Sequence, residues 1–133
     1  MDTNKKDLVY ISHPSSGLKE NTLDVEKIIR RLYADNNLYS KYCFVSPIHC
    51  FGFMYHDVEY FKGLSFCTDL LMHCKIMLVF GDWTNSEACK AEIDLCRELG
   101  IPVIFIDNSD KLDSEIQDNK LDKKIEKLTK QYR

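Results

Sequence analysis

The chain has 133 residues, of which 44% are hydrophobic and 29% charged, and its formal net charge is −3 at pH 7. This length and composition predict a single domain, residues 1–133, with a real hydrophobic core. This net charge gives no overall attraction to a nucleic acid polymer or a membrane surface. No apolar run approaches the length of a bilayer span. The polar segment 1–6 lacks the apolar region of a signal peptide, so we expect a cytoplasmic protein.

The first half of the chain alternates strand and helix patterns. Residues 7–12 (DLVYIS) predict a strand, and residues 13–17 (HPSSG) predict a loop. Apolar residues then recur at helical spacing from about residue 21 to 35. Residues 42–47 (YCFVSP) predict a second strand that the proline closes, and residues 49–57 predict an aromatic, glycine-containing loop.

The second half continues this alternation. Residues 58–74 predict a helix, followed by a buried strand at 76–80 and a turn at 81–85. A helix over 86–100 ends at its glycine, and residues 101–106 predict another buried strand. The apolar side of the helix 58–74 consists of Tyr60, Leu64, Cys67, Leu71 and Cys74.

The last part of the chain is polar before it recovers a helical pattern. Residues 107–119 predict a polar connection that is irregular or briefly helical. An amphipathic helix over 120–132 follows, with one packed face and one solvated face, although a contact with a partner is an alternative. Its apolar positions are Leu121, Ile125, Leu128 and Tyr132.

Strands that alternate with helices predict an α/β protein. We expect a three-layer, flavodoxin- or Rossmann-like domain with a parallel sheet of four or five strands and a core at 7–106. Ligands of such sheets bind beyond the carboxyl ends of the strands. The loops after Ser12, Pro47 and Gly81 should therefore share one rim.

The cysteines and histidines do not form a metal motif. The six cysteines contain no C-x-x-C pair, and the seven-residue gaps return a cysteine to the same face of a helix, which favours reduced thiols in the core. The histidines also lack the spacing of a zinc site. We predict no metal and no cofactor.

The helix 86–100 (SEACKAEIDLCRELG) has an acid where an apolar residue is expected. On a helical wheel Glu92 falls in the middle of an apolar arc. A buried carboxylate must be compensated or must bind a proton. The arc consists of Ala88, Ala91, Leu95, Cys96 and Leu99.

The rim offers donors for an anion close to this acid. Thr84, Asn85 and Ser86 begin the helix, where free N–H groups suit a phosphate or a carboxylate, although the same residues commonly serve only as caps. Glu92 lies about a turn and a half into the helix. A carboxylate beside a held phosphoester can attack or stabilise an anomeric carbon.

Several of these residues match one known family. The matching residues are Tyr10, Ile11, Ser12, Pro14, Ser16 and Gly17 (YISxPxSG), Asp69, then Gly81, Asp82, Trp83 and Ser86 (GDWxxS), and Glu92. Over residues 7–106 they resemble the nucleoside 2-deoxyribosyltransferase superfamily, most closely its small phage and bacterial members. The chain is also similar to the 2'-deoxynucleoside 5'-phosphate N-hydrolases, whose serine lies six residues before the catalytic glutamate, as Ser86 does here.

The resemblance implies cleavage or exchange of the bond between base and deoxyribose. Glu92 would be the nucleophile on C1', Tyr10 would orient it, and Asp69 would handle the sugar hydroxyl or the leaving base. On the wheel Asp69 lies on the polar side of its helix, so only the resemblance gives it this role. The implied substrate-binding residues are Ser12, His13, Ser16, Gly17, Asp82, Trp83, Ser86, Phe51 and Phe53.

The resemblance divides these residues between phosphate and base. The serines with Gly17 would hold a 5'-phosphate, and the aromatic residues with Asp82 would border the base. His13 and Ala88 stand where relatives usually carry glycine, which narrows the space for a phosphate against the backbone. The partner expected is a small nucleotide or nucleoside, and the family implies a homodimer or a higher homo-oligomer.

Two other functions stay open. One is a viral or regulatory protein that binds a nucleotide or a signalling nucleotide without turnover, which His13 and Ala88 favour. The other is cleavage of nicotinamide dinucleotide, because Ser86, Cys89 and Glu92 also resemble the catalytic segment of Toll/interleukin-receptor domains. The residues Ser46-Pro47 and GDW (81–83) fit the transferase group better.

Overall fold

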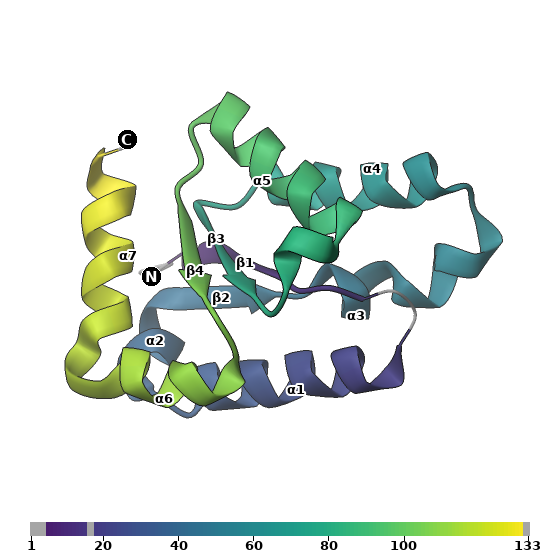
Figure 1. Ribbon diagram of the computed structural model, residues 1–133. Helices are drawn as coiled ribbons and strands as arrows, with labels where there is room; N and C mark the ends of the chain where they lie inside the picture. The colour runs from purple at the N-terminus through teal and green to yellow at the C-terminus, as the bar shows by residue number, and fades with distance from the viewer. Residues whose placement is uncertain (1–4, 16–17, 132–133) are drawn as a thin grey trace.

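The computed structural model describes residues 5–15 and 18–131. They form three layers, in which one parallel sheet lies between two layers of helices (Figure 1). The strand order is β2-β1-β3-β4, and each neighbouring pair is parallel. The predicted α/β fold class is thus confirmed, with four strands. The strands are β1 (Asp7–Ser12), β2 (Tyr42–Val45), β3 (Ile76–Phe80) and β4 (Val103–Ile106).

Helices cover both faces of the sheet. Helices α1 and α6 lie below it and α4 and α5 above it in Figure 1. The helices are α1 (Lys19–Tyr33), α2 (Asn36–Lys41), α3 (Pro47–Phe51), α4 (Tyr60–Leu71), α5 (Glu87–Leu99), α6 (Ser109–Ile116) and α7 (Lys120–Gln131). The 3₁₀ segments are η1 (Gly52–Asp57), η2 (Trp83–Asn85) and η3 (Gln117–Asn119).

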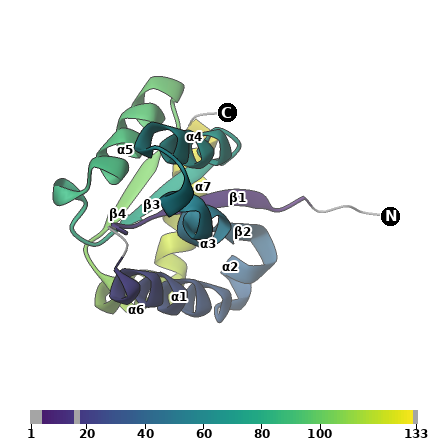
Figure 2. The same cartoon turned by 90° about the vertical axis from the view of Figure 1, so that its right-hand side faces the viewer.

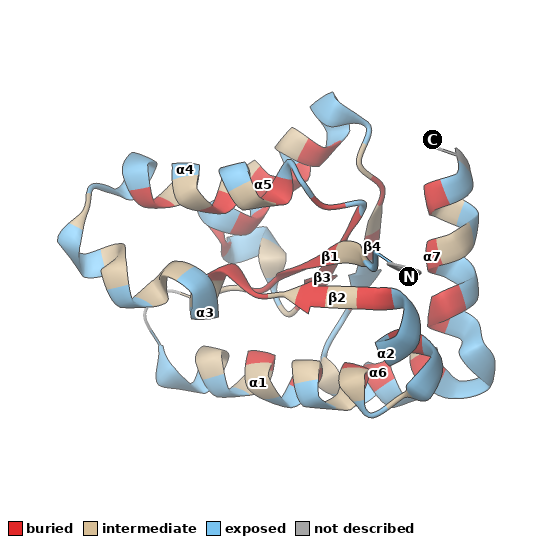
Figure 3. Cartoon of the chain, turned by 180° about the vertical axis from the view of Figure 1, so that it is seen from behind, coloured by how far each residue is buried: buried red, intermediate tan, exposed pale blue. Residues whose placement is uncertain are grey.

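Side chains of β1 alternate between two apolar cores, one on each face of the sheet. Val9 and Ile11 pack with α1, α6 and α7, whereas Tyr10 packs with the side of α4 and α5 that faces the sheet. Figure 3 shows this as buried residues along the strands and the inner sides of the helices. Burial on both faces explains why these strands are continuous apolar runs.

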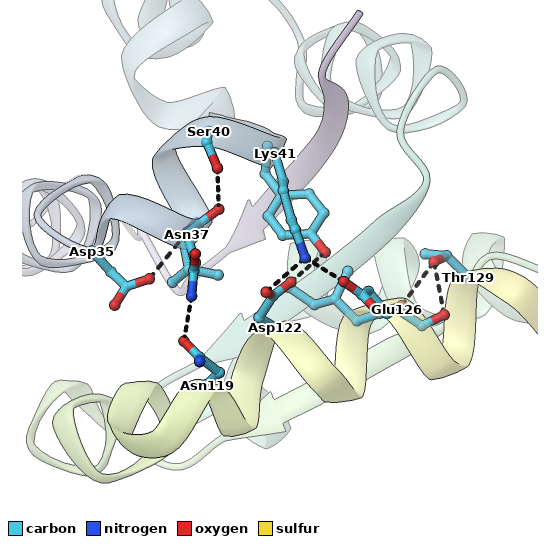
Figure 4. Close-up of polar contacts among 11 residues, drawn as sticks. Asp35, Asn37, Ser40, Lys41, Asn119, Asp122, Glu126 and Thr129 are labelled. Carbon is cyan, nitrogen blue, oxygen red and sulfur yellow. Dashed lines mark hydrogen bonds and ion pairs between the residues drawn. The ribbon is translucent and has the colours of Figure 1, made fainter. Parts of the chain in front are cut away.

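Helix α7 closes the end of the sheet where the strands begin. Leu121 and Ile125 are fully buried, as the predicted packed face requires. Asp122 accepts hydrogen bonds from Tyr42 at 2.9 Å and from Lys41 at 2.8 Å, and Glu126 also pairs with Lys41 (Figure 4). These polar contacts join α7 to α2 and to the start of β2.

The segment 46–57 differs from the prediction. Ser46 caps α3 by accepting a hydrogen bond from the His49 N–H, and Pro47 occupies the first turn of that helix. Proline is favoured there because its missing N–H has no partner in a helix start. The proline therefore begins a helix instead of closing a strand, and residues 49–57, predicted as a loop, are helical in α3 and η1.

Two predicted helix faces also need correction. In α5 the buried side consists of Cys89, Glu92, Ile93 and Cys96, whereas Ala88 and Leu99 are exposed. The buried face is thus rotated toward the cysteines, although Glu92 still lies on it. In α4 Tyr60 is 55% exposed, so the apolar side begins only after the first turn.

Among residues 5–15 and 18–131, no helix combines the length and the apolarity that a bilayer crossing needs.

Candidate active site

Glu92 is the buried acid that the sequence predicts, with only 4% of its surface exposed. It lies on α5. Ser86 is the N-cap of this helix, and its hydroxyl accepts a hydrogen bond from the Cys89 N–H at 3.2 Å. Gly100 ends the helix in a left-handed conformation with φ of 72°. Both ends of α5 are therefore fixed by local sequence, and Glu92 is held against the sheet.

Two hydroxyl groups of β1 hold the Glu92 carboxylate. Tyr10 donates to Oε2, and the Ser12 Oγ donates to Oε1 at 2.8 Å. Residues two apart in a strand point to the same face, so β1 aims both hydroxyls at α5. Within the described part of the chain, no lysine, arginine or histidine forms an ion pair with Glu92.

This environment shifts the pKa of Glu92. Burial raises the pKa of Glu92 to about 7, and the bonds from Tyr10 and Ser12 act in the opposite direction. Burial, with the Glu92 charge, also raises the pKa of Tyr10, so the phenol keeps its proton and remains a donor. Near neutral pH Glu92 therefore exists both as an acid and as a carboxylate.

Thiols and phenols surround the carboxylate. The Cys89 Sγ lies 3.4 Å from the Ser12 Oγ, and the Cys67 Sγ lies 3.1 Å from the Tyr55 hydroxyl. The Glu92 charge also contributes to raising the pKa of Tyr60, after burial and the Glu87 charge. The sequence predicted Cys67 as a packing residue, Cys89 as a core thiol that also belongs to the segment resembling Toll/interleukin-receptor domains, and Tyr60 as part of the apolar side of its helix. It gave Tyr55 no role. The i, i+3 spacing of Cys89 and Glu92 is the signal that places the thiol beside the acid.

The loops after β1 and β3 adjoin at the carboxyl end of the sheet, as predicted. A Cβ added at Gly81, whose φ is 77°, would lie 3.2 Å from Pro14 and 3.6 Å from His13. This edge faces the viewer in Figure 2, where α3 and the beginning of α1 lie in front. The predicted phosphate-binding residues Ser16 and Gly17 lie outside the described residues.

His13 is held on the α1 side of this rim. Its Nε2 lies 2.8 Å from the Asp24 carboxylate, and its Nδ1 lies 2.7 Å from the Pro14 carbonyl oxygen. Both partners are oxygen acceptors within hydrogen-bonding distance of a ring nitrogen. His13 therefore binds its own chain with both nitrogens and does not point a free donor at a ligand.

The start of α5 is partly occupied by protein groups. The Thr84 hydroxyl donates to Asp82 at 2.7 Å, and Asn85 donates to the same carboxylate. These bonds lower the pKa of the exposed Asp82 carboxyl. Two of the predicted anion donors thus bind an acid of the chain, whereas Ser86, buried and used as a cap through its oxygen, can still donate its own proton.

The remaining predicted residues lie further along the surface. Asp69 is exposed on α4, as the wheel predicts. Phe51 packs on Phe66 with ring centroids 5.8 Å apart, and Phe53 is 78% exposed. Trp83 packs on Phe105 of the edge strand β4, with centroids 5.3 Å apart. The structure thus brings Tyr10, Ser12 and Glu92 together, and among the described residues it records no direct contact from Ser86 or the other predicted residues to Glu92.

Within the described residues no group of three or more histidines, cysteines or acids is arranged to hold a metal ion. The fold and the site define a doubly wound parallel α/β protein with a hydroxyl-bound carboxylate at the carboxyl end of its sheet. Residues 7–105 match the family described as a domain of unknown function (DUF4406), and the chain belongs to that family. No curated protein matches the chain.

Proposed function

We propose that this protein cleaves the bond between base and deoxyribose in a nucleoside or nucleoside 5'-monophosphate, with Glu92 as the nucleophile. The observation that carries the proposal is the environment of Glu92, which is buried on two hydroxyl donors and has no cationic partner among the described residues. Such burial opposes folding, and a pKa near neutrality is typical of a reacting group. The resemblance to the deoxyribosyltransferase superfamily supports the same role.

The reaction consists of two displacements at C1'. A Glu92 oxygen bonds to C1' as the C1'–N bond breaks, and the base leaves with the electron pair and takes a proton from solvent. Water then attacks C1' of the glycosyl ester, which frees the carboxylate and releases a proton. Two inversions retain the configuration, and the net products are free base and the deoxyribose or its 5-phosphate.

The contacts of Tyr10 and Ser12 support this mechanism. Each donates to a different carboxylate oxygen, so the plane of the carboxylate is fixed before substrate binds. Ser86 caps the N-terminus of α5, and the N–H groups of a helix N-terminus favour a substrate with a phosphate. The Asp82 carboxylate near this end opposes one, so nucleosides and their monophosphates both belong in the test.

The experiment is an assay for free base. The purified chain is incubated with each deoxynucleoside, each deoxynucleoside 5'-monophosphate and nicotinamide dinucleotide, and the products are separated by chromatography. We expect free base from at least one deoxy substrate and none with Glu92→Gln. Asp122→Asn is the matched control, because it neutralises another buried acid. Absence of base from every deoxy substrate would refute the proposal, and nicotinamide release alone would indicate a dinucleotide glycohydrolase instead.

Binding without turnover is the second candidate function. Binding without turnover is favoured because the chain itself occupies several of the donors expected for a ligand. Thr84 and Asn85 bond to Asp82, and His13 contacts Asp24 and Pro14. Calorimetry separates the two functions. A binding protein gives equal affinities for the wild-type chain and Glu92→Gln with no product in either, whereas an enzyme gives product with the wild-type chain alone.

A further inference from the structure

A serine, a histidine and an acid form a line in a groove between α1 and α3. The Ser46 Oγ lies 2.8 Å from the His49 Nδ1, and the His49 Nε2 lies 3.0 Å from a carboxylate oxygen of Glu26. Ser46 and His49 belong to the start of α3, which lies above the first half of α1 in Figure 3, and Glu26 belongs to α1. All three side chains line one groove of about 430 Å³.

The acid at the end of this line determines where the protons lie. An ionised carboxylate only accepts, so a neutral His49 carries its proton on Nε2 and presents the lone pair of Nδ1 to Ser46. The hydrogen bond from His49 is the main cause that lowers the pKa of Glu26, and the carboxyl therefore stays ionised. The Ser46 hydroxyl then donates to Nδ1. His49 is thus oriented as a general base for this hydroxyl.

The two ring nitrogens are exchanged relative to serine proteases. Only three residues separate Ser46 from His49, so Nδ1 faces the serine and Nε2 faces Glu26 on the neighbouring helix. The roles of nucleophile, base and orienting acid are nevertheless the same, and such triads recur on unrelated folds.

The capping of α3 does not account for this line. Ser46 caps the helix through a lone pair of its oxygen, which accepts the His49 N–H at 3.4 Å. A cap needs neither an imidazole on the hydroxyl proton nor a carboxylate beyond the imidazole. A hydroxyl can accept and donate at once, so capping leaves the Ser46 proton to the His49 ring.

The lining of the groove favours a small ester with an apolar acyl group. Ile29 and Phe44 contribute apolar surface, and the volume is in the range of small-molecule sites. Arg30 lines the same groove, and its guanidinium lies 3.8 Å from Glu26. A cation in this place stabilises the negative charge that develops on a carbonyl oxygen under attack.

We infer that Ser46 and His49 form a second catalytic site, positioned by Glu26, that hydrolyses carboxylic esters through an acyl-serine. The Ser46 Oγ bonds to the carbonyl carbon and its proton passes to His49. The bond to the alcohol oxygen then breaks, and the alcohol leaves with that proton. Water next attacks the acyl carbon and gives a proton to His49, and the Ser46 oxygen takes this proton as its bond to the acyl carbon breaks. The net products are a carboxylic acid and an alcohol.

The experiment incubates the full chain with p-nitrophenyl acetate. We expect nitrophenol release above the rate in buffer and, by peptide mass mapping, an acetyl group on Ser46. Ser46→Asn should lower the catalysed rate by at least about 10²-fold, because asparagine also caps a helix but has no nucleophile. His49→Gln should have the same effect, and Glu26→Gln should lower the rate by about tenfold, since the amide no longer fixes the proton on Nε2.

Free imidazoles and thiols also react with this ester, so the test includes both. His56→Gln is the matched control, because His56 is another exposed histidine that belongs to η1, and it should keep the wild-type rate. Cys50 is an exposed thiol that lines the same groove, and the mass mapping shows whether the acetyl group is on Cys50 or on Ser46.

The outcomes bear on this site alone, because the assay contains no nucleoside. Acetylation of Ser46 that is lost in His49→Gln supports the inference, whatever the base-release assay shows for Glu92. The inference is overturned by release at the buffer rate, by a Ser46→Asn rate equal to that of the wild-type chain, or by an acetyl group on Cys50 instead of Ser46. An equal loss of rate in His56→Gln and His49→Gln also overturns it.

Discussion

Two buried carboxylates lie at opposite ends of the sheet. Glu92 on α5 lies beside the carboxyl end of β1, and Asp122 on α7 lies beside the start of β2, with 4% and 6% of their surfaces exposed. Each accepts a hydrogen bond from a tyrosine of a neighbouring strand, Tyr10 and Tyr42 respectively. The two acids thus share residue class, burial and a phenol donor.

The cation is the difference between them. Lys41 bonds to Asp122 at 2.8 Å, as Figure 4 shows, whereas among the described residues only uncharged side chains bond to Glu92. The hydrogen bonds to Asp122 and Glu126 raise the pKa of Lys41 and keep the lysine charged. A cation offsets much of the cost of burying a carboxylate, whereas a buried carboxylate without one is kept at a cost in stability and is available for chemistry.

The largest expected difference is in activity. Glu92→Gln should lower the rate of base release by about 10³-fold or more, because an amide cannot form the glycosyl ester. Asp122→Asn should change the rate by less than about twofold, since it lies at the other end of the sheet. Rates of free base release by chromatography check both, and a Glu92→Gln variant that keeps a tenth of the wild-type rate contradicts the assignment.

The second difference is in stability as a function of pH. The pKa of Glu92 is about 7 in the fold against its ordinary 4.5, so between these values the native state holds a proton that the unfolded chain has lost. Stability should therefore fall as pH rises from about 4.5 to 7 and then level off. At pH 8 Glu92→Gln should be more stable than the wild-type chain by about 3 kcal/mol, and near pH 4 the two should match.

Asp122→Ala is the opposite case. It should lose roughly 1–3 kcal/mol at pH 8, because the Tyr42 hydroxyl and Lys41 lose their acceptor. Urea unfolding at the two pH values measures both variants. If Glu92→Gln proves less stable than the wild-type chain at pH 8, Glu92 is a structural acid like Asp122.

Tyr10 and Tyr42 should differ in their effects on activity and stability as the two acids do, but by smaller amounts. Tyr10→Phe removes a donor that lowers the pKa of Glu92, so the ascending limb of the pH–rate profile should move to higher pH and the rate at neutral pH should fall by roughly 10–100-fold. Tyr42→Phe should leave the profile in place and cost about 1 kcal/mol of stability. Equal pH profiles for the two variants would remove the distinction between the tyrosines.

The sequence predicts the acid at Glu92 but not its neighbours from α4 and η1. Strands β1 and β3 have the predicted bounds because continuous apolar runs buried on both faces have few alternatives. Glu92 is found because a charge within an apolar arc is a local signal. Cys67 and Tyr55 meet each other only through tertiary packing, which no local pattern encodes.

The segment 46–57 shows a second limit of sequence reasoning. A proline can end a strand or begin a helix. Here Pro47 begins α3, because Ser46 before it acts as the cap of that helix. The aromatic residues that follow are predicted as a loop, yet they form the short helix α3 and the 3₁₀ segment η1, and Phe51 packs on Phe66. Asp122 is missed for a related reason, since its partners Lys41 and Tyr42 are distant in the chain.

The smallest expected effect concerns the cation itself. Lys41→Met should cost about 0.5–1 kcal/mol, because the lysine side chain is 40% exposed and solvent screens its attraction to Asp122. In an Asp122→Asn background the same substitution should cost less, and 1 M salt should shrink the difference. Unfolding of the four chains of this double-mutant cycle measures the coupling. If the cycle shows no coupling, Tyr42 alone keeps Asp122 buried. A phenol donor is then sufficient to hold either buried carboxylate, and pairing with a cation no longer distinguishes the structural acid from the reactive one.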